Sequence, residues 1–253
     1  MVRDAASTAA VRRSVEQYWI STGIAAIARN DQADDFKPPA WNKGGAIART
    51  VGRLYSRGNT GGGACTATVV GKNTVVTAGH CVRTSTPGGT SASATWDKDL
   101  YFVPGYLDGE RPYGGFTVRS VHMAKDWQEP GYDVAMLEMN TASDGRGISA
   151  ITGAQNVDFA FEPGARTHQI GYPYTARPLH CEGPSSRDDR APSMIAIPCH
   201  MGIGSSGGPY IVGLGATGFG SVIAVNVSGN DSTSFGTPLG AFAKVLYNQS
   251  EHR

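Results

Sequence analysis

Length, composition and charge limit what this protein can be. The chain has 253 residues, enough for one large β domain with an extension or for two small domains. Its formal net charge is +1, which argues against nucleic acid or an anionic membrane surface as a partner. No apolar run reaches the length of a membrane span. The 34 glycines favour many short strands joined by tight turns.

Residues 1–49 are predicted to form an N-terminal extension with one short helix and a linker. The linker is residues 30–45, which are rich in Asp, Pro and Gly. Residues 1–13 contain no apolar core of a signal peptide, so we expect the signal of a secreted form to be absent from this sequence. The helix is predicted from residues that share one face at helical spacing: Val11, Val15, Tyr18 and Trp19.

Residues 50–253 alternate strand-like segments with turns and predict an all-β domain. The strands fall into two groups, at about 50–140 and about 150–240. Phe159–Phe161 is one of the strands expected in the second group. The chain is expected to end with a short helix from about Leu239 to Gln249.

A candidate nucleophile lies in the stretch Gly204–Pro209, which spells Gly-Ser-Ser-Gly-Gly-Pro. Small residues allow a tight turn and a close approach of the backbone to another group. A serine hydroxyl on such a turn becomes a nucleophile only if a base stands beside it. Without a base, the stretch is an ordinary glycine-rich turn between strands.

The chain offers both a base and a carboxylate upstream of this turn. His80 follows the β-branched run Thr74–Thr77 and the small pair Ala78-Gly79. Asp133 stands at the start of the apolar run Val134–Leu137, where an unpaired charge is costly to bury. The other candidate carboxylates lie in polar or loop contexts: Asp97, Asp99, Asp108 and Asp126.

These three segments, in the order His, Asp, Ser, resemble the signature stretches of the chymotrypsin/trypsin-like serine peptidases, and in particular of the secreted bacterial branch. The resemblance covers roughly residues 50 to 245. It implies two six-stranded antiparallel β-barrels of chymotrypsin-like fold, with an N-terminal extension and a short C-terminal helix. It also implies one peptidase domain, residues 50–253.

The resemblance implies a role for each residue of the site. Ser206 is the expected nucleophile, because its spacing to Gly207-Gly208 selects it over Ser205. His80 is expected to take the serine proton and pass it to the leaving amine, while Asp133 orients the imidazole. The backbone N–H groups of Gly204 and Ser206 are expected to form the oxyanion hole.

One position departs from the family pattern and bears on activation. Trypsin-like zymogens carry an aspartate directly before the nucleophile, which pairs with a newly freed N-terminal amine. Ser205 occupies that position here, so we expect that any activation does not use this switch. Residues 1–49 are then either a pro-segment cut near Arg49 or a permanent extension.

The resemblance also places a pocket for the substrate residue that precedes the cut bond. Trypsin has an aspartate at the position of His200, so cleavage after Lys or Arg is not expected. His200 either faces an acidic substrate side chain or packs beside a disulfide, and no preference is assigned. The pocket is expected to be lined by His200, Met201, Asn226, Val227 and Ser228.

The four cysteines fall into two pairs that are local in sequence, which favours the disulfides Cys65–Cys81 and Cys181–Cys199. The family resemblance favours the same pairing, and disulfides imply an oxidising compartment. Four free thiols are one alternative. A zinc site is another, because three histidines adjoin cysteines, but no metal-type spacing such as Cys-x-x-Cys occurs. His122, His168 and His180 are interpreted as structural.

The sequence therefore predicts a secreted, monomeric serine endopeptidase that acts on protein or peptide substrates. Neither a cofactor nor a metal is expected. The alternatives are a catalytically inactive protease-like binding protein and a latent zymogen form. An esterase fits the Gly-x-Ser-x-Gly pattern at Gly204–Gly208, but in that fold the serine precedes its acid and histidine.

Overall fold

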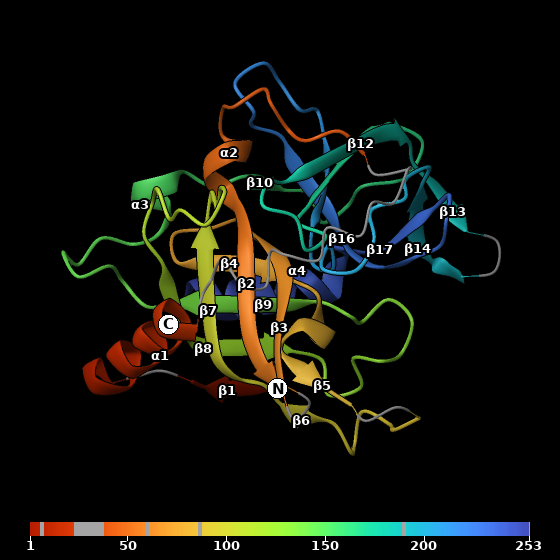
Figure 1. Ribbon diagram of the computed structural model, residues 1–253. Coiled ribbons are helices and arrows are strands. Elements are labelled where there is room, and N and C mark those ends of the chain that lie inside the picture. The colour runs from red at the N-terminus through yellow and green to blue at the C-terminus, as the bar shows by residue number, and fades with distance from the viewer. Residues whose placement is uncertain (6–7, 23–37, 59–60, 86–87, 189–190, 253) are drawn as a thin grey trace.

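Figure 1 shows the computed structural model, which describes residues 1–5, 8–22, 38–58, 61–85, 88–188 and 191–252. The strands are β1 (Val2–Asp4), β2 (Val51–Gly58), β3 (Gly61–Val69), β4 (Thr74–Thr77), β5 (Arg83–Thr84), β6 (Thr95–Trp96), β7 (Lys98–Pro104), β8 (Phe116–Met123), β9 (Ala135–Met139), β10 (Asn156–Val157), β11 (Arg166–Gly171), β12 (Leu179–Pro184), β13 (Ser186–Asp188), β14 (Ala191–Ile197), β15 (Pro209–Val212), β16 (Ser221–Gly229) and β17 (Ser234–Pro238). The helices are α1 (Ala9–Thr22), α2 (Ile47–Thr50), α3 (Ser149–Thr152) and α4 (Ala241–Glu251), with one 3₁₀ turn, η2 (Gly79–Cys81). Among the residues described, no helix is long and apolar enough to cross a membrane.

The first barrel is a closed ring of six strands, as the sequence predicts. Its order is β8-β7-β2-β3-β4-β9, and β8 closes the ring by pairing with β9 as well as with β7. The interior is apolar and includes Leu54, Val75, Phe102 and Leu137, each fully buried. All neighbours around the ring are antiparallel, which suits the short turns between successive strands.

The second barrel is nearly closed and has more strands than the six expected. The sheet runs β12-β11-β15-β16-β17-β14-β13, and β10 adds a short parallel pairing to β16. Its interior includes Ile195, Ile197, Tyr210 and Ile223. The two barrels lie next to each other in Figure 1, with β13 and β14 on the far side of the second barrel from the first.

The expected strand at Phe159–Phe161 does not form. The second barrel instead begins with the two-residue β10, and the chain then bends. Asp158 causes the bend, because its Oδ1 accepts a hydrogen bond from the backbone N–H of Ala160 at 2.9 Å. This Asx turn competes with ladder pairing, which explains why two aromatic residues did not suffice for a strand.

Residues 1–5 and 8–22 pack on the first barrel. Strand β1 extends the sheet at β8, with Arg3 opposite Val121. In α1, Trp19 is 2% exposed, packs on Tyr55 with ring centroids 5.2 Å apart, and donates to the carbonyl oxygen of Asp99 at 2.5 Å. Residues 30–37 of the predicted linker lie outside the described residues, whereas residues 38–45 are described.

The C-terminal helix α4 follows the second barrel in the chain but packs against the first barrel. It contacts β9, β8 and β4, and its Ser250 hydroxyl lies 2.8 Å from that of Thr74. Every residue of β4 and β9 is buried, because one face points into the barrel and the other is covered. The strand that leads to His80 is therefore held on both sides.

Both predicted disulfides are present, Cys65–Cys81 and Cys181–Cys199, and the described residues contain no free cysteine. Cys65 and Cys81 connect β3 to η2 in the first barrel. Cys181 and Cys199 connect β12 to the residues just after β14 in the second. Each closes a short loop, with separations of 16 and 18 residues.

Replacement of Cys181 and Cys199 together by Ala is expected to lower the free energy of unfolding by about 3 kcal/mol. A crosslink removes loop-closure entropy from the unfolded chain, and a loop of this length corresponds to that magnitude. Urea unfolding followed by tryptophan fluorescence measures it, with the wild type as reference. An unchanged midpoint and slope would show that the bridge does not constrain the unfolded chain.

Candidate active site

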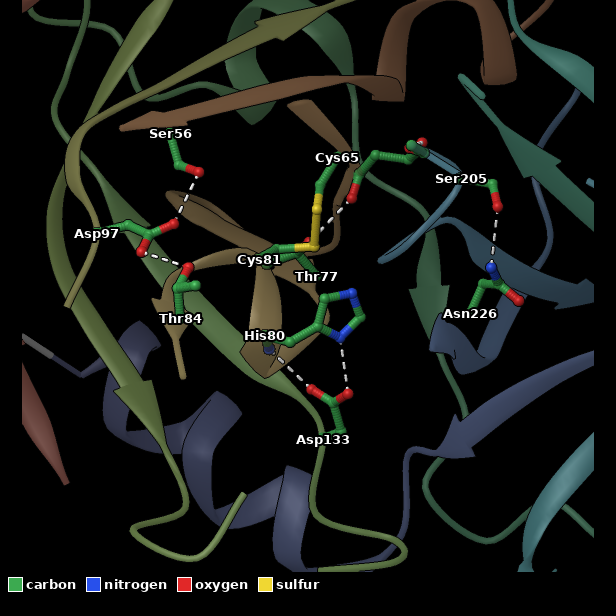
Figure 2. The surroundings of a disulfide bond; sticks show 12 residues. Ser56, Cys65, Thr77, His80, Cys81, Thr84, Asp97, Asp133, Ser205 and Asn226 are labelled. Atoms are coloured by element: carbon green, nitrogen blue, oxygen red, sulfur yellow. Dashed lines mark hydrogen bonds and ion pairs between the residues drawn. A yellow bond between two sulfur atoms is a disulfide. The ribbon is translucent and has the colours of Figure 1, made fainter. Parts of the chain in front are cut away.

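His80 and Asp133 meet at the end of the first barrel. Strand β4 ends at Thr77, and the 3₁₀ turn η2 presents the His80 ring to the cleft. The carboxylate of Asp133, just before β9, receives two hydrogen bonds from one residue: the His80 backbone N–H to Oδ1 at 2.9 Å, and His80 Nδ1 to Oδ2 at 2.7 Å. Figure 2 shows both contacts, with the Cys65–Cys81 bridge beside the ring.

The residues before His80 are small for a spatial reason. A Cβ at Gly79 would lie 3.0 Å from Asp133 Oδ1 and 3.0 Å from the Met123 side chain. The carboxylate reaches the His80 backbone only because that space is empty. The small residue that marks the motif in the sequence therefore serves the His80–Asp133 contact.

The His80–Asp133 pair is partly shielded from water, with side chains 29% and 17% exposed. Burial by itself would lower the pKa of His80, because it disfavours the charged ring. The charge and the hydrogen bond of Asp133 outweigh burial and raise this pKa above its ordinary value. The imidazolium form is therefore stabilised, as a base that must accept a proton requires.

The serine turn is held by the first barrel as well as by the second. Thr66 in β3 donates its backbone N–H to the carbonyl oxygen of Ser206 at 2.8 Å and its Oγ1 to that of Gly204 at 3.1 Å. From the second barrel, the carbonyl oxygen of Asn226 in β16 accepts the backbone N–H of Gly207 at 2.7 Å. The turn thus sits at the junction of the two barrels.

Two glycines of the turn are required by their geometry. Gly204 has φ +95° and Gly207 has φ +78°, in the left-handed region that favours glycine. A Cβ at Gly207 would lie 2.1 Å from Oγ1 of Thr77, and one at Gly204 would lie 2.8 Å from the carbonyl oxygen of Tyr172. Only residues without a Cβ let this turn dock against both barrels.

The two serines of the turn have different surroundings. Ser205 is 1% exposed, donates its hydroxyl to the carbonyl oxygen of Gly202 at 2.6 Å, and accepts from Asn226 Nδ2 at 3.0 Å. Ser206 is partly exposed and lines the same cavity as His80 and Gly204, of about 330 Å³. Figure 2 shows Ser205 directed toward Asn226 and away from the His80 ring.

Two backbone donors of the turn have no acceptor within the part of the chain that the structure describes. They are the N–H groups of Gly204 and Ser206, whereas that of Ser205 donates to Gly202 at 3.3 Å. Unpaired amides next to a cleft can bind an anionic oxygen. They are the two groups that the sequence assigns to an oxyanion hole.

All five residues predicted for the substrate pocket line one cavity of about 380 Å³, which also reaches Ser206; they are His200, Met201, Asn226, Val227 and Ser228. The Asn226 side chain also has a second role, which the sequence did not predict. Besides its bond to Ser205, its Oδ1 accepts from the Tyr210 hydroxyl at 3.1 Å. Its amide therefore connects the serine turn to β15 at the wall of the substrate cavity.

Three further residues at the cleft make contacts that the sequence did not predict. Thr66 holds the serine turn, but nothing in its strand distinguishes it from other threonines. Ile203 is 78% exposed and lines both cavities beside Gly204, where the exposed side chain can contact a substrate. Asp97 is 4% exposed, accepts from Ser56 and Thr84, and lines the cavity that contains His80.

Comparison with known proteins places this geometry among peptidases. The family model described as Trypsin matches residues 44–179, more than half of the chain. The crystal structure of the protease Anisep from Arthrobacter nicotinovorans is 29% identical with a TM-score of 0.71, covering 81% of this chain and 96% of that one. A thermostable serine protease, AL20, from an extremophilic microorganism is 27% identical with a TM-score of 0.72, covering 81% and 98%.

A shorter match is found with the extracellular metalloprotease of Bacillus subtilis (strain 168). It is 33% identical over 79 residues, which are 30% of this chain and 23% of that protein. The matched part of this chain therefore spans less than a quarter of the length of that relative.

Proposed function

Because the chain belongs to the trypsin family, we propose that it is a secreted serine endopeptidase that hydrolyses peptide bonds through an acyl-enzyme. The observation that carries the proposal is one arrangement: His80, which donates two hydrogen bonds to Asp133, lines the same cavity as the partly exposed Ser206. A nucleophile, a base and a group that orients the base are the parts that acyl transfer to serine requires.

In the proposed reaction, Ser206 Oγ attacks the carbonyl carbon of the peptide, and His80 Nε2 takes the serine proton. The developing oxyanion is bound by the N–H groups of Gly204 and Ser206. The C–N bond then breaks as His80 gives its proton to the leaving amine. Water repeats the sequence on the acyl-enzyme, which releases the acid and restores Ser206.

Asp133 acts on this reaction through His80. Its Oδ2 accepts from Nδ1, which leaves Nε2 unprotonated and available as the base in the neutral ring. Its second oxygen holds the His80 backbone, so that ring position and tautomer are set by one carboxylate. No metal or cofactor takes part in these steps.

The substrate class follows from the family, whose members act on peptide bonds. We assign the cavity of about 380 Å³ to the substrate residue before the cut bond. His200 lines this cavity where trypsin has an aspartate, which argues against cleavage after Lys or Arg. The disulfides and the likeness to an extracellular protease favour an extracellular location.

For residues 1–49, the packing supports a permanent extension over a pro-segment. Removing them would take away β1 and the buried Trp19, which packs on Tyr55 of the first barrel. Neither β1 nor α1 lines the cavity that contains His80 and Ser206. We propose that the active protein is a monomer that keeps this segment, which N-terminal sequencing of the active form checks.

A fluorophosphonate probe tests the proposed function on the full chain. We expect one adduct per chain by intact mass, at Ser206, together with cleavage of a denatured protein substrate at a rate that the probe abolishes. One adduct without cleavage would indicate an esterase-like or highly selective enzyme. Absence of any adduct, both before and after limited removal of residues 1–49, would leave the inactive binding protein as the correct alternative.

A further inference from the structure

Three potential metal ligands come together on the second barrel, away from the catalytic residues. In the antiparallel pair β11–β12, His168 lies directly opposite Glu182. His180 lies two residues before Glu182 on β12, so both project from the same face of the sheet. The register of one hairpin thus gathers two imidazoles and a carboxylate from residues 168–182.

The distances within this cluster match those between ligands of one metal ion. His168 Nδ1 lies 3.0 Å from His180 Nε2 and 3.2 Å from Glu182 Oε2, and all three ligand atoms lie within 4.8 Å of one another. Zinc bonds of about 2.0–2.1 Å in a tetrahedral site separate ligand atoms by roughly 3.3 Å. Without an ion, the nitrogens share a hydrogen bond, and an ion would take the place of its proton.

Neighbouring groups orient these ligands. Arg166 binds Glu182 Oε1, which leaves Oε2 toward His168. Trp41 packs edge-on against His180, with ring centroids 5.1 Å apart. Such outer contacts fix the orientation of metal ligands in known sites.

An ion also has a route to the cluster. His180 and Glu182 line an open cavity of about 530 Å³ together with Trp41 and Lys43. The His168 side chain is more shielded, at 13% exposed. The site is therefore partly enclosed but accessible from solvent.

We propose that His168, His180 and Glu182 bind one divalent cation, with Zn²⁺ the best match, and that the ion joins β11 to β12. Two imidazoles and one carboxylate are a ligand set that zinc accepts, with a fourth position left for water. The positive charges of Lys43 and Arg166 nearby weaken attraction for a cation, so we expect a dissociation constant in the micromolar range.

This site is separate from the cysteines considered in the sequence. The sulfurs of Cys65 and Cys81 lie near His80, but they are bonded to each other and are not available as ligands. Cys181 lies between His180 and Glu182 and is bonded to Cys199, directly before His200 of the substrate cavity. The ion would therefore add a second crosslink on β12, next to the disulfide.

The test is zinc binding to the full chain in a His80→Ala background, which removes the catalytic histidine as a competing ligand. We expect calorimetry to show one Zn²⁺ per chain. At a zinc concentration of about 100 times the dissociation constant, the melting temperature should rise by about 5 to 10 °C. Co²⁺ in place of Zn²⁺ should give the visible absorption bands of a tetrahedral site.

Two ligand variants and one matched control decide the assignment. Adding Glu182→Gln or His168→Ala should weaken binding by more than about 100-fold and remove the thermal shift. His252→Ala, at an exposed histidine outside the cluster, should change neither the zinc affinity nor the thermal shift. Glu182→Gln keeps its size at a partly exposed position, so near-ultraviolet dichroism should show an intact fold. Absence of stoichiometric binding, or binding that survives both ligand variants, would overturn the proposal.

Discussion

Replacement of Ser206 by Ala is expected to lower kcat by about 10⁶-fold and to abolish labelling by a fluorophosphonate. The attacking oxygen is lost, and removal of the nucleophile alone costs nearly as much as removal of a whole triad. KM should change little, because the residues that line the substrate cavity remain. Steady-state kinetics with a chromogenic peptide and intact mass after probe treatment measure the two effects.

Ser205→Ala is the matched control, one residue away. It removes a hydroxyl that is bonded to Gly202 and Asn226 but keeps Ser206. Loss of these two hydrogen bonds should lower kcat by roughly 10-fold, with labelling still complete. If the two variants behaved alike, or if Ser206→Ala kept its adduct, the assignment of the nucleophile would be wrong.

Replacement of Asp133 by Asn should lower kcat by about 10⁴-fold and move the pH profile. An asparagine can donate to Nδ1, which favours the wrong tautomer of His80. In the wild type, Asp133 raises the pKa of His80 above its ordinary value, so the acid limb of kcat/KM should lie above about pH 6.5. Without this carboxylate, burial dominates, and the pKa of His80 and the acid limb should fall.

The same pair makes stability depend on pH in a defined direction. A histidine whose pKa is raised by folding contributes stability below its unfolded pKa of about 6.5, and this contribution is lost as pH rises through the folded value. The difference in stability between wild type and Asp133→Asn that comes from His80 should therefore shrink as pH rises through that window. Denaturant unfolding at several pH values measures it.

Asp97→Asn controls for a general effect of a nearby carboxylate. Asp97 also raises the pKa of His80, but less than Asp133 does, and it makes no hydrogen bond to the ring. In the Asp97→Asn variant, the acid limb of kcat/KM should shift less than in Asp133→Asn. Its kcat should stay within about 10-fold of the wild type. Equal shifts in the two variants would contradict the assigned role of Asp133.

Local patterns in the sequence were sufficient for much of this protein. Runs of β-branched residues with glycine turns predicted the strands, because both signals lie within a few residues of each other. The segments around His80, Asp133 and Ser206 were recognisable by their resemblance to family motifs, in which small residues adjoin His80 and Ser206 and an apolar run follows Asp133. The cysteine pairing also followed from separations of 16 and 18 residues.

What only the tertiary structure decided depends on contacts between distant segments. Thr66 holds the serine turn across 138 residues because the two barrels dock there, and the Asn226 side chain reaches Ser205 because β16 pairs with β15, the strand that follows the turn. The sequence treated His168 and His180 as structural and did not group them with Glu182, although His168 lies opposite Glu182 in the sheet. The face that a strand residue occupies depends on its register with a partner, and register is set by burial of the whole sheet.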